Sequence, residues 1–197
     1  MIRLLDFMLN DWKDNASIDR ARIGFFGFSR GGFTGLVLAG GKPDFGRIAR
    51  YCPESDRTPA CEQFRKNEIP PDPPYDARIR VAVVADPGPT YPFTSENLAS
   101  IRIPIQVWRS ELLAGNEDDV AGIARVARSL PGKPDIRVVA HAGHWAFLPR
   151  CTASQAASSP QLCTDAADFD RANFHNEFNV AIVSFLREHL IDNGENR

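Results

Sequence analysis

The sequence lacks several features that would assign it to whole classes of protein. No apolar run approaches the length of a membrane span, and no cluster of lysine and arginine suggests a nucleic-acid surface. The formal net charge of −2 gives no field that would recruit nucleic acid or an anionic membrane. No Gly-x-Gly-x-x-Gly follows a strand pattern and no phosphate-binding loop occurs, so nucleotide use is not indicated. We therefore expect neither a nucleic-acid nor a membrane partner.

We expect no secretory signal peptide in the first residues. Residues 1–12 carry Arg3 and Asp6 inside an apolar pattern, whereas a secretory h-region is uninterrupted. The apolar positions of this segment fall on one helical face, so residues 2–13 are predicted to form an amphipathic helix.

Cysteine is scarce, and its placement argues against a metal site. The four cysteines form two local pairs, Cys52 with Cys61 and Cys151 with Cys163. Neither pair has the short Cys-x2–4-Cys spacing of a metal site, and no histidine cluster completes one, so we expect no metal and no other cofactor. Two loop-closing disulfides suit both pairs and would imply an oxidising compartment; the alternative is four independent reduced thiols.

What remains is an ordinary globular composition. The chain has 197 residues, of which 43% are hydrophobic and 24% charged. A chain of this length buries a sizeable core and is most simply one domain, so we predict a single domain over residues 1–197. No internal repeat is present.

The chain is organised around one stretch, residues 22–32. An apolar run ends in Gly27-Phe28-Ser29-Arg30-Gly31, and small, helix-compatible residues follow. This is the pattern of a nucleophile elbow, in which a serine lies on a strained turn between a buried strand and a helix. We expect Gly27 and Gly31 to be required because a Cβ at either position would clash, and we expect the Arg30 backbone N–H to face a developing oxyanion.

Apolar runs and helical patterns alternate along the rest of the chain. Strands are predicted for the run before Ser29 and for residues 80–85, 103–108 and 136–140. Helices are predicted after the elbow and over residues 95–100, 120–130 and 171–190. This alternation predicts an α/β fold with a parallel sheet and helices on both faces. Residues 44–76, rich in proline and charge, are predicted to be a lid or excursion with one or two short helices.

A serine nucleophile needs a base, and the base needs an acid that orients it. In the α/β-hydrolase arrangement the order along the chain is serine, acid, histidine. His144 follows the last predicted strand on an Ala-Gly turn, so we assign it as the base. His141, at the end of that strand, is the rival, and His175 and His189 on the last helix are interpreted as structural or solvated.

The acid is left open between three positions. Glu111 is the nearest carboxylate in the loop after the third predicted strand, and it is the first choice. The cluster at 117–119, represented by Asp118, restores a Gly-x-x-Asp pattern if that loop is extended. Asp86, at the end of the preceding strand, is the third candidate.

Four segments together resemble the α/β hydrolases, and specifically a secreted, dienelactone-hydrolase-like branch of them. They are residues 22–32, 103–111, 142–151 and 169–175. The resemblance implies Ser29 as nucleophile, His144 as base, hydrolysis of a small-molecule carboxylic ester or lactone, and an extracytoplasmic origin. Dienelactone hydrolases proper use a cysteine nucleophile, and Ser29 stands there in this chain, so lactone specificity is not carried over.

The resemblance also implies strands before the elbow, whereas one predicted helix precedes it here. We therefore expect a partial α/β-hydrolase fold without the N-terminal strands, in which a partner or a further N-terminal segment covers the edge of the elbow strand. The function expected first is a serine ester hydrolase that forms an acyl-enzyme. The alternatives are a catalytically inactive or binding-only truncated hydrolase, and a peptidase or acyltransferase on the same fold.

Overall fold

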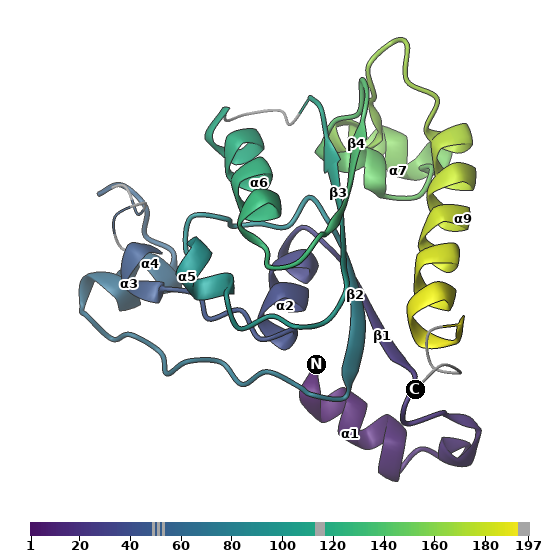
Figure 1. The fold of residues 1–197 in the computed structure, drawn as a ribbon. Helices are drawn as coiled ribbons and strands as arrows, with labels where there is room; N and C mark the ends of the chain where they lie inside the picture. Colours follow the sequence, from purple (N-terminus) through teal and green to yellow (C-terminus); the bar gives the residue numbers. More distant parts are fainter. Residues whose placement is uncertain (49, 51, 53, 113–116, 193–197) are drawn as a thin grey trace.

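One parallel sheet forms the centre of the molecule. The structure is a computed structural model that describes residues 1–197 except 49, 51, 53, 113–116 and 193–197. Among the described residues, β1 (Ile23–Phe28), β2 (Ile79–Ala85), β3 (Ile105–Ser110) and β4 (Asp135–Val139) pair in the order β1-β2-β3-β4 (Figure 1). Since all four strands are parallel, the residues that follow them meet at one edge of the sheet.

The predicted helices are present, with small shifts of their ends. The longer ones are α1 (Ile2–Asn10), α2 (Arg30–Leu38), α6 (Glu117–Ser129) and α9 (Arg171–Leu190). The shorter ones are η1 (Asn15–Ser17), α3 (Phe45–Ile48), α4 (Pro59–Arg65), α5 (Ser95–Leu98), η3 (His144–Phe147), α7 (Ala153–Ser158) and α8 (Pro160–Cys163). The first helix ends earlier than predicted, where Asn10 and Asp11 favour a cap over a helix interior.

Helices cover both faces of the sheet, as the continuous apolar character of its strands predicted. In β2, Ala82 and Val84 belong to a core shared with α2, α5 and α6, whereas Val81 and Val83 belong to a second core built on α9. Figure 1 shows α2 and α6 on one side of the sheet and α9 on the other. Side chains that alternate between two buried faces explain why this strand has no polar face. The predicted α/β class is confirmed.

Residues 44–76 form the predicted excursion, which contains α3 and α4. The segment lies on the same side of the sheet as α2, away from α9 (Figure 1). Thr58 caps α4 by accepting a hydrogen bond from the Cys61 amide, and the Cys52–Cys61 disulfide closes the loop before it. At its end the excursion contacts α2, where the Asp76 amide donates to the Leu38 carbonyl over 3.0 Å. Its role as a lid stays a prediction.

Two further observations concern the outside of the fold. Within the described residues β1 pairs with β2 alone, so its other side is the edge of the sheet, and Phe26 on this strand is 47% exposed. None of the described helices is both long and apolar enough to cross a membrane.

Candidate active site

Ser29 lies on a sharp turn between β1 and α2. Its backbone has φ 55° and ψ −118°, a conformation that non-glycine residues rarely adopt. Three backbone hydrogen bonds hold it there: its amide donates to the Ala85 carbonyl over 2.9 Å, and its carbonyl accepts from the amides of Phe33 and Gly88, each over 3.1 Å. A strained residue that its surroundings fix in this way is typical of a functional site.

The glycines of the elbow have different roles from those predicted. A Cβ on Gly27 would lie 2.2 Å from the Gly31 carbonyl oxygen, so the strand and helix cannot close on this turn with any larger residue. A Cβ on Gly31 would meet no atom within 4 Å, so the prediction of a clash there was wrong. The close approach is made by the next residue, Gly32, where a Cβ would lie 2.9 Å from the Cα of Pro87.

His144 faces Ser29 from the other side of the site. It begins η3, five residues after β4 ends, and its Nε2 lies 3.0 Å from the Ser29 Oγ. The imidazole packs against the Phe28 ring, with 4.6 Å between ring centroids, and its side chain is 21% exposed. The strand end and the turn after it thus bring together the two residues that the sequence paired.

The carboxylate beside His144 belongs to Asp86. Its Oδ2 lies 3.1 Å from the His144 Nδ1, and its side chain is fully buried at the end of β2. Ser110, at the end of β3, donates to both carboxylate oxygens, from its amide over 2.8 Å and from its hydroxyl over 2.6 Å. Because a carboxylate only accepts, the Nδ1 carries the proton, and this leaves Nε2 free to accept from the serine hydroxyl.

Glu111, the first choice of acid from the sequence, does not contact the His144 imidazole. Its Oε2 accepts a hydrogen bond from the His141 amide over 2.8 Å, so it holds the turn before His144 rather than the imidazole. His141, the rival base, is exposed and pairs through Nδ1 with Asp168 over 2.8 Å. Glu111 follows β3 by one residue, where its side chain leaves the site, whereas Ser110 points into it.

The structure does not show whether Asp118, the remaining acid candidate, could reach His144. Asp118 lies in α6, and its side chain is outside the part of the chain that the structure describes. Reasoning from sequence missed Ser110 altogether. One feature of the sequence could have pointed to Ser110. Asp86 ends an apolar strand, so its carboxylate is expected to be buried, and a buried carboxylate needs hydrogen-bond donors from neighbouring strand ends.

A cavity opens in front of the three residues. Its volume is about 380 Å³, within the range of small-molecule sites. Besides Ser29, Asp86 and His144, it is lined by Arg30, residues 87–91, Ile123 and Trp145. Arg30 is the first residue of α2, where backbone amides have no carbonyl partner within the helix. Among the described residues, no group of three or more His, Cys, Asp and Glu side chains is placed to hold a metal ion.

Comparison with known proteins adds little to this geometry. Neither the protein-family models nor the curated protein sequences contain a match to the chain. A similar solved structure is an acetyl ester-xyloside bifunctional hydrolase from Caldicellulosiruptor lactoaceticus, with 13% sequence identity and a TM-score of 0.38. The match covers 80% of this chain and 56% of that protein. A likeness this distant carries no argument about activity, which has to be inferred from the site itself.

Proposed function

We propose that the protein is a serine hydrolase that cleaves carboxylic esters through an acyl-enzyme. The Ser29 hydroxyl is the nucleophile, His144 the general base, and Asp86 the acid that holds the imidazole in the required tautomer. The substrate is a small-molecule ester whose carbonyl lies in the cavity beside Ser29.

The reaction follows from the hydrogen bond between Ser29 and His144 and the one between His144 and Asp86. Ser29 Oγ attacks the ester carbonyl while its proton moves to His144 Nε2, and the Asp86 carboxylate stabilises the imidazolium that forms. The oxyanion of the tetrahedral intermediate accepts from the Arg30 backbone N–H at the start of α2. His144 then donates its proton to the leaving alcohol, which leaves the acyl group on Ser29. Water, activated by the same imidazole, releases the acid and restores the serine.

The observation that carries the proposal is the continuous relay from Ser29 Oγ through His144 to Asp86, over 3.0 Å and 3.1 Å. A buried polar cluster with only a structural role would need no access to substrate, whereas this relay borders a cavity. The strained backbone of Ser29 and of Asp86, with φ of 55° and 38°, also favours a catalytic role, because a structural network gains nothing from such strain.

Hydrolysis of p-nitrophenyl acetate by the purified chain tests the proposal. We expect Ser29→Ala and His144→Ala each to lower kcat by about 10³-fold or more, while both variants stay folded. The serine of η1, Ser17→Ala, is the matched control and should keep the parent rate. If Ser29→Ala is as active as the parent, the proposal is wrong; if the parent has no activity, the binding-only interpretation takes its place.

The proposal also includes a family branch and a cellular location for the protein. Membership of the dienelactone-hydrolase-like branch is supported by the four matching sequence segments. An extracytoplasmic location is supported by two disulfides, Cys52–Cys61 and Cys151–Cys163, since such bonds persist in oxidising compartments.

A further inference from the structure

The three residues of the relay are not held equally well. Ser29 is fixed by the elbow, and Asp86 is fixed by two hydrogen bonds from Ser110. His144 lies on η3, a helix of four residues that follows a turn and therefore has little hydrogen bonding of its own. The alignment of both His144 hydrogen bonds thus depends on what η3 packs against.

One side chain of α9 reaches the backbone of η3. The Nε2 of His175 lies 2.9 Å from the Ala146 carbonyl oxygen, two residues beyond His144. Ala146 is fully buried, and a carbonyl at the end of a short helix lacks a partner within that helix. A carbonyl only accepts, so His175 must carry a proton on Nε2, which is true of one neutral tautomer and of the imidazolium.

Aromatic side chains surround this part-buried hydrogen bond. The Phe147 ring of η3 packs against Phe174 and Phe178 of α9, with 5.5 Å between ring centroids in each pair. The His175 ring itself lies edge-on to Phe178 at 6.0 Å. Ala146 is fully buried, so loss of this hydrogen bond would leave its carbonyl without a partner away from water, which is costly.

We propose that His175 is a positioning residue for the base: by donating to the Ala146 carbonyl it fixes η3, and so keeps His144 aligned with both Ser29 and Asp86. The expected effect on rate rests on the proposed function. The effect on the position of His144 can be measured even if the protein hydrolyses no ester. His175 touches neither Ser29 nor Asp86, so it acts through the backbone that carries His144. A displacement of about 1 Å in a catalytic group can cost about 10²-fold in rate.

Two substitutions separate the hydrogen bond from the packing. His175→Phe keeps an aromatic ring but removes the donor, whereas His175→Gln keeps an N–H that can reach the carbonyl. Asn179→Ala is the matched control, because Asn179 is an exposed residue one turn further along α9 whose side chain makes no hydrogen bond or ion pair within the described part of the chain. All variants are compared below their melting temperatures, so that the folded fraction stays constant.

The first readout is kinetic and the second is spectroscopic. We expect His175→Phe to lower kcat for p-nitrophenyl acetate by about 10–100-fold with little change in KM, and His175→Gln to recover most of that loss. The proton on His144 Nδ1, hydrogen-bonded to Asp86, should give a downfield ¹H NMR signal that disappears in His144→Ala. That signal should broaden or vanish in His175→Phe, return in His175→Gln and be unchanged in Asn179→Ala.

The outcomes distinguish this inference from the proposed function. If His175→Phe keeps both the parent kcat and the downfield signal, or if His175→Gln is no better than His175→Phe, the positioning role is wrong. If the signals behave as expected but no ester is hydrolysed, the proposed function fails and the positioning role stands. The parent chain supplies a test without substitution: neutral His175 should carry its proton on Nε2 by ¹⁵N NMR, and the Nδ1–H tautomer would overturn the inference.

Discussion

Individual residues around the site carry conformational strain that the rest of the chain largely avoids. Among the described residues, positive φ at a non-glycine position occurs at Ser29, Asp86, His141 and Asn67. Ser29 and Asp86 belong to the relay, and His141 lies in the turn before His144. Each costs roughly 1–3 kcal/mol, so the surrounding fold must hold these residues in place at the expense of overall stability.

The first prediction at the residue scale compares the effects on kcat of replacing Asp86 and of replacing Glu111. Asp86→Asn should lower kcat by about 10⁴-fold, because an amide stabilises the wrong imidazole tautomer and no longer balances the imidazolium charge. Glu111→Gln should lower kcat by less than about tenfold, because its neutral amide oxygen can still accept from the His141 amide. Steady-state ester hydrolysis at several pH values checks both variants.

Reversal of these effects would contradict the assignment. A large loss in Glu111→Gln together with a small loss in Asp86→Asn would mean that Glu111, and not Asp86, acts as the acid. Circular dichroism spectra of both variants would show whether either change disturbs the fold instead of the chemistry.

The pairing of Ser29 with His144 could be predicted from sequence, whereas the carboxylate that lies beside His144 could not. Ser29 has a local pattern with a geometric meaning, and His144 lies directly after a strand, so their order along the chain was sufficient. The acid position depends on which of two strand ends turns its carboxylate toward the imidazole. That choice is made by the backbone at Asp86, with φ 38°, and by the donors of Ser110, neither of which leaves a mark in a single sequence.

At the scale of elements, an ion-pair cluster fastens α1 and the excursion to the start of β2. The Arg78 guanidinium donates to the Asp76 carboxylate over 2.8 Å and pairs with Asp6 of α1 over 2.7 Å. The hydrogen bonds from Arg78 hold the pKa of Asp76 below its usual range, and Asp76 itself is buried. The cluster thus joins α1 to residues 76–78, a segment that lies far along the chain.

This lowered pKa gives a second prediction, on stability against pH. A carboxyl group with a lower pKa in the folded state contributes stability above its unfolded pKa of about 3.9, and loses it as the pH falls through its folded pKa. The melting temperature of the parent should therefore fall more steeply below about pH 4 than that of Asp76→Asn. Asp72→Asn, an exposed position of the same excursion, is the control and should keep the parent's slope. Parallel slopes for parent and Asp76→Asn would contradict the role of the cluster.

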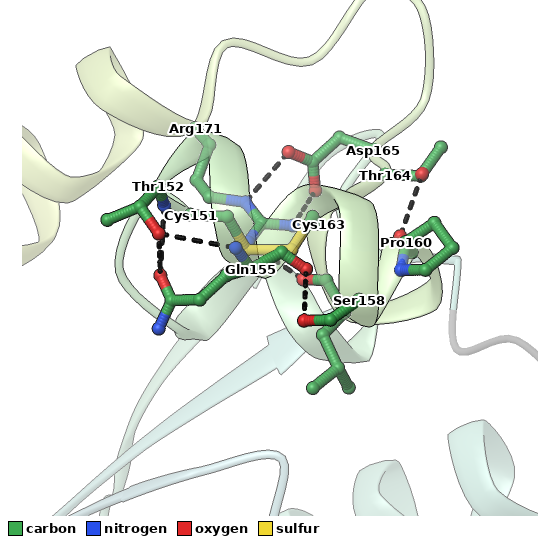
Figure 2. The surroundings of a disulfide bond; sticks show 10 residues. Cys151, Thr152, Gln155, Ser158, Pro160, Cys163, Thr164, Asp165 and Arg171 are labelled. Carbon is green, nitrogen blue, oxygen red and sulfur yellow. Dashed lines mark hydrogen bonds and ion pairs between the residues drawn. A yellow bond between two sulfur atoms is a disulfide. The ribbon is translucent and has the colours of Figure 1, made fainter.

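The segment after η3 is closed by a disulfide and held on α9 by Arg171. The Cys151–Cys163 disulfide encloses α7 and α8, and Arg171 donates to both carboxylate oxygens of Asp165 over 2.7 Å (Figure 2). Arg171 also donates to the Leu162 carbonyl over 3.0 Å, so the end of the enclosed loop is held on the first turn of α9. Local cysteine spacing predicted this disulfide, but not the arginine that supports it.

The third prediction concerns the double replacement Cys151→Ser with Cys163→Ser. It should lower the free energy of unfolding by about 2–4 kcal/mol, because the unfolded chain regains the freedom of the opened loop. The kcat should fall less than about tenfold, since η3 keeps its own contacts with α9. Urea unfolding measures the first effect, and replacement of Cys52 and Cys61 provides a disulfide control on the excursion. An unchanged urea midpoint, or loss of activity in a fully folded variant, would contradict this division of roles.

At the scale of the whole molecule, the elements that could be predicted from sequence are those buried on both faces. The four strands were identified because short apolar runs between helical patterns are typical of the buried strands of a parallel sheet. The excursion over residues 44–76 was predicted to contain one or two short helices, but their positions were not predicted. The reason is that α3 and α4 are short and held by contacts with the rest of the fold, such as the hydrogen bond from Arg47 to the Tyr91 carbonyl at 3.0 Å. No periodic pattern in the sequence encodes such contacts.

The open side of β1 gives a fourth prediction at the same scale. Phe26 is 47% exposed on a strand that pairs on one side only among the described residues. An exposed apolar edge tends to associate, and a lysine on the strand discourages this. The purified chain should bind a dye for exposed apolar surface and sediment partly as larger species, and Phe26→Lys should reduce both. A monodisperse parent without dye binding would contradict the expectation that something covers this edge.

The central claim, that Ser29 is a nucleophile activated by His144 and Asp86, is tested most directly by covalent labelling. The folded chain is treated with a fluorophosphonate, and the modified residue is identified by mass spectrometry of its peptides. The account predicts one phosphonate per chain, on Ser29, with labelling absent in Ser29→Ala and strongly slowed in His144→Ala and Asp86→Asn. An unlabelled parent, or a label on another residue that persists in Ser29→Ala, would contradict it.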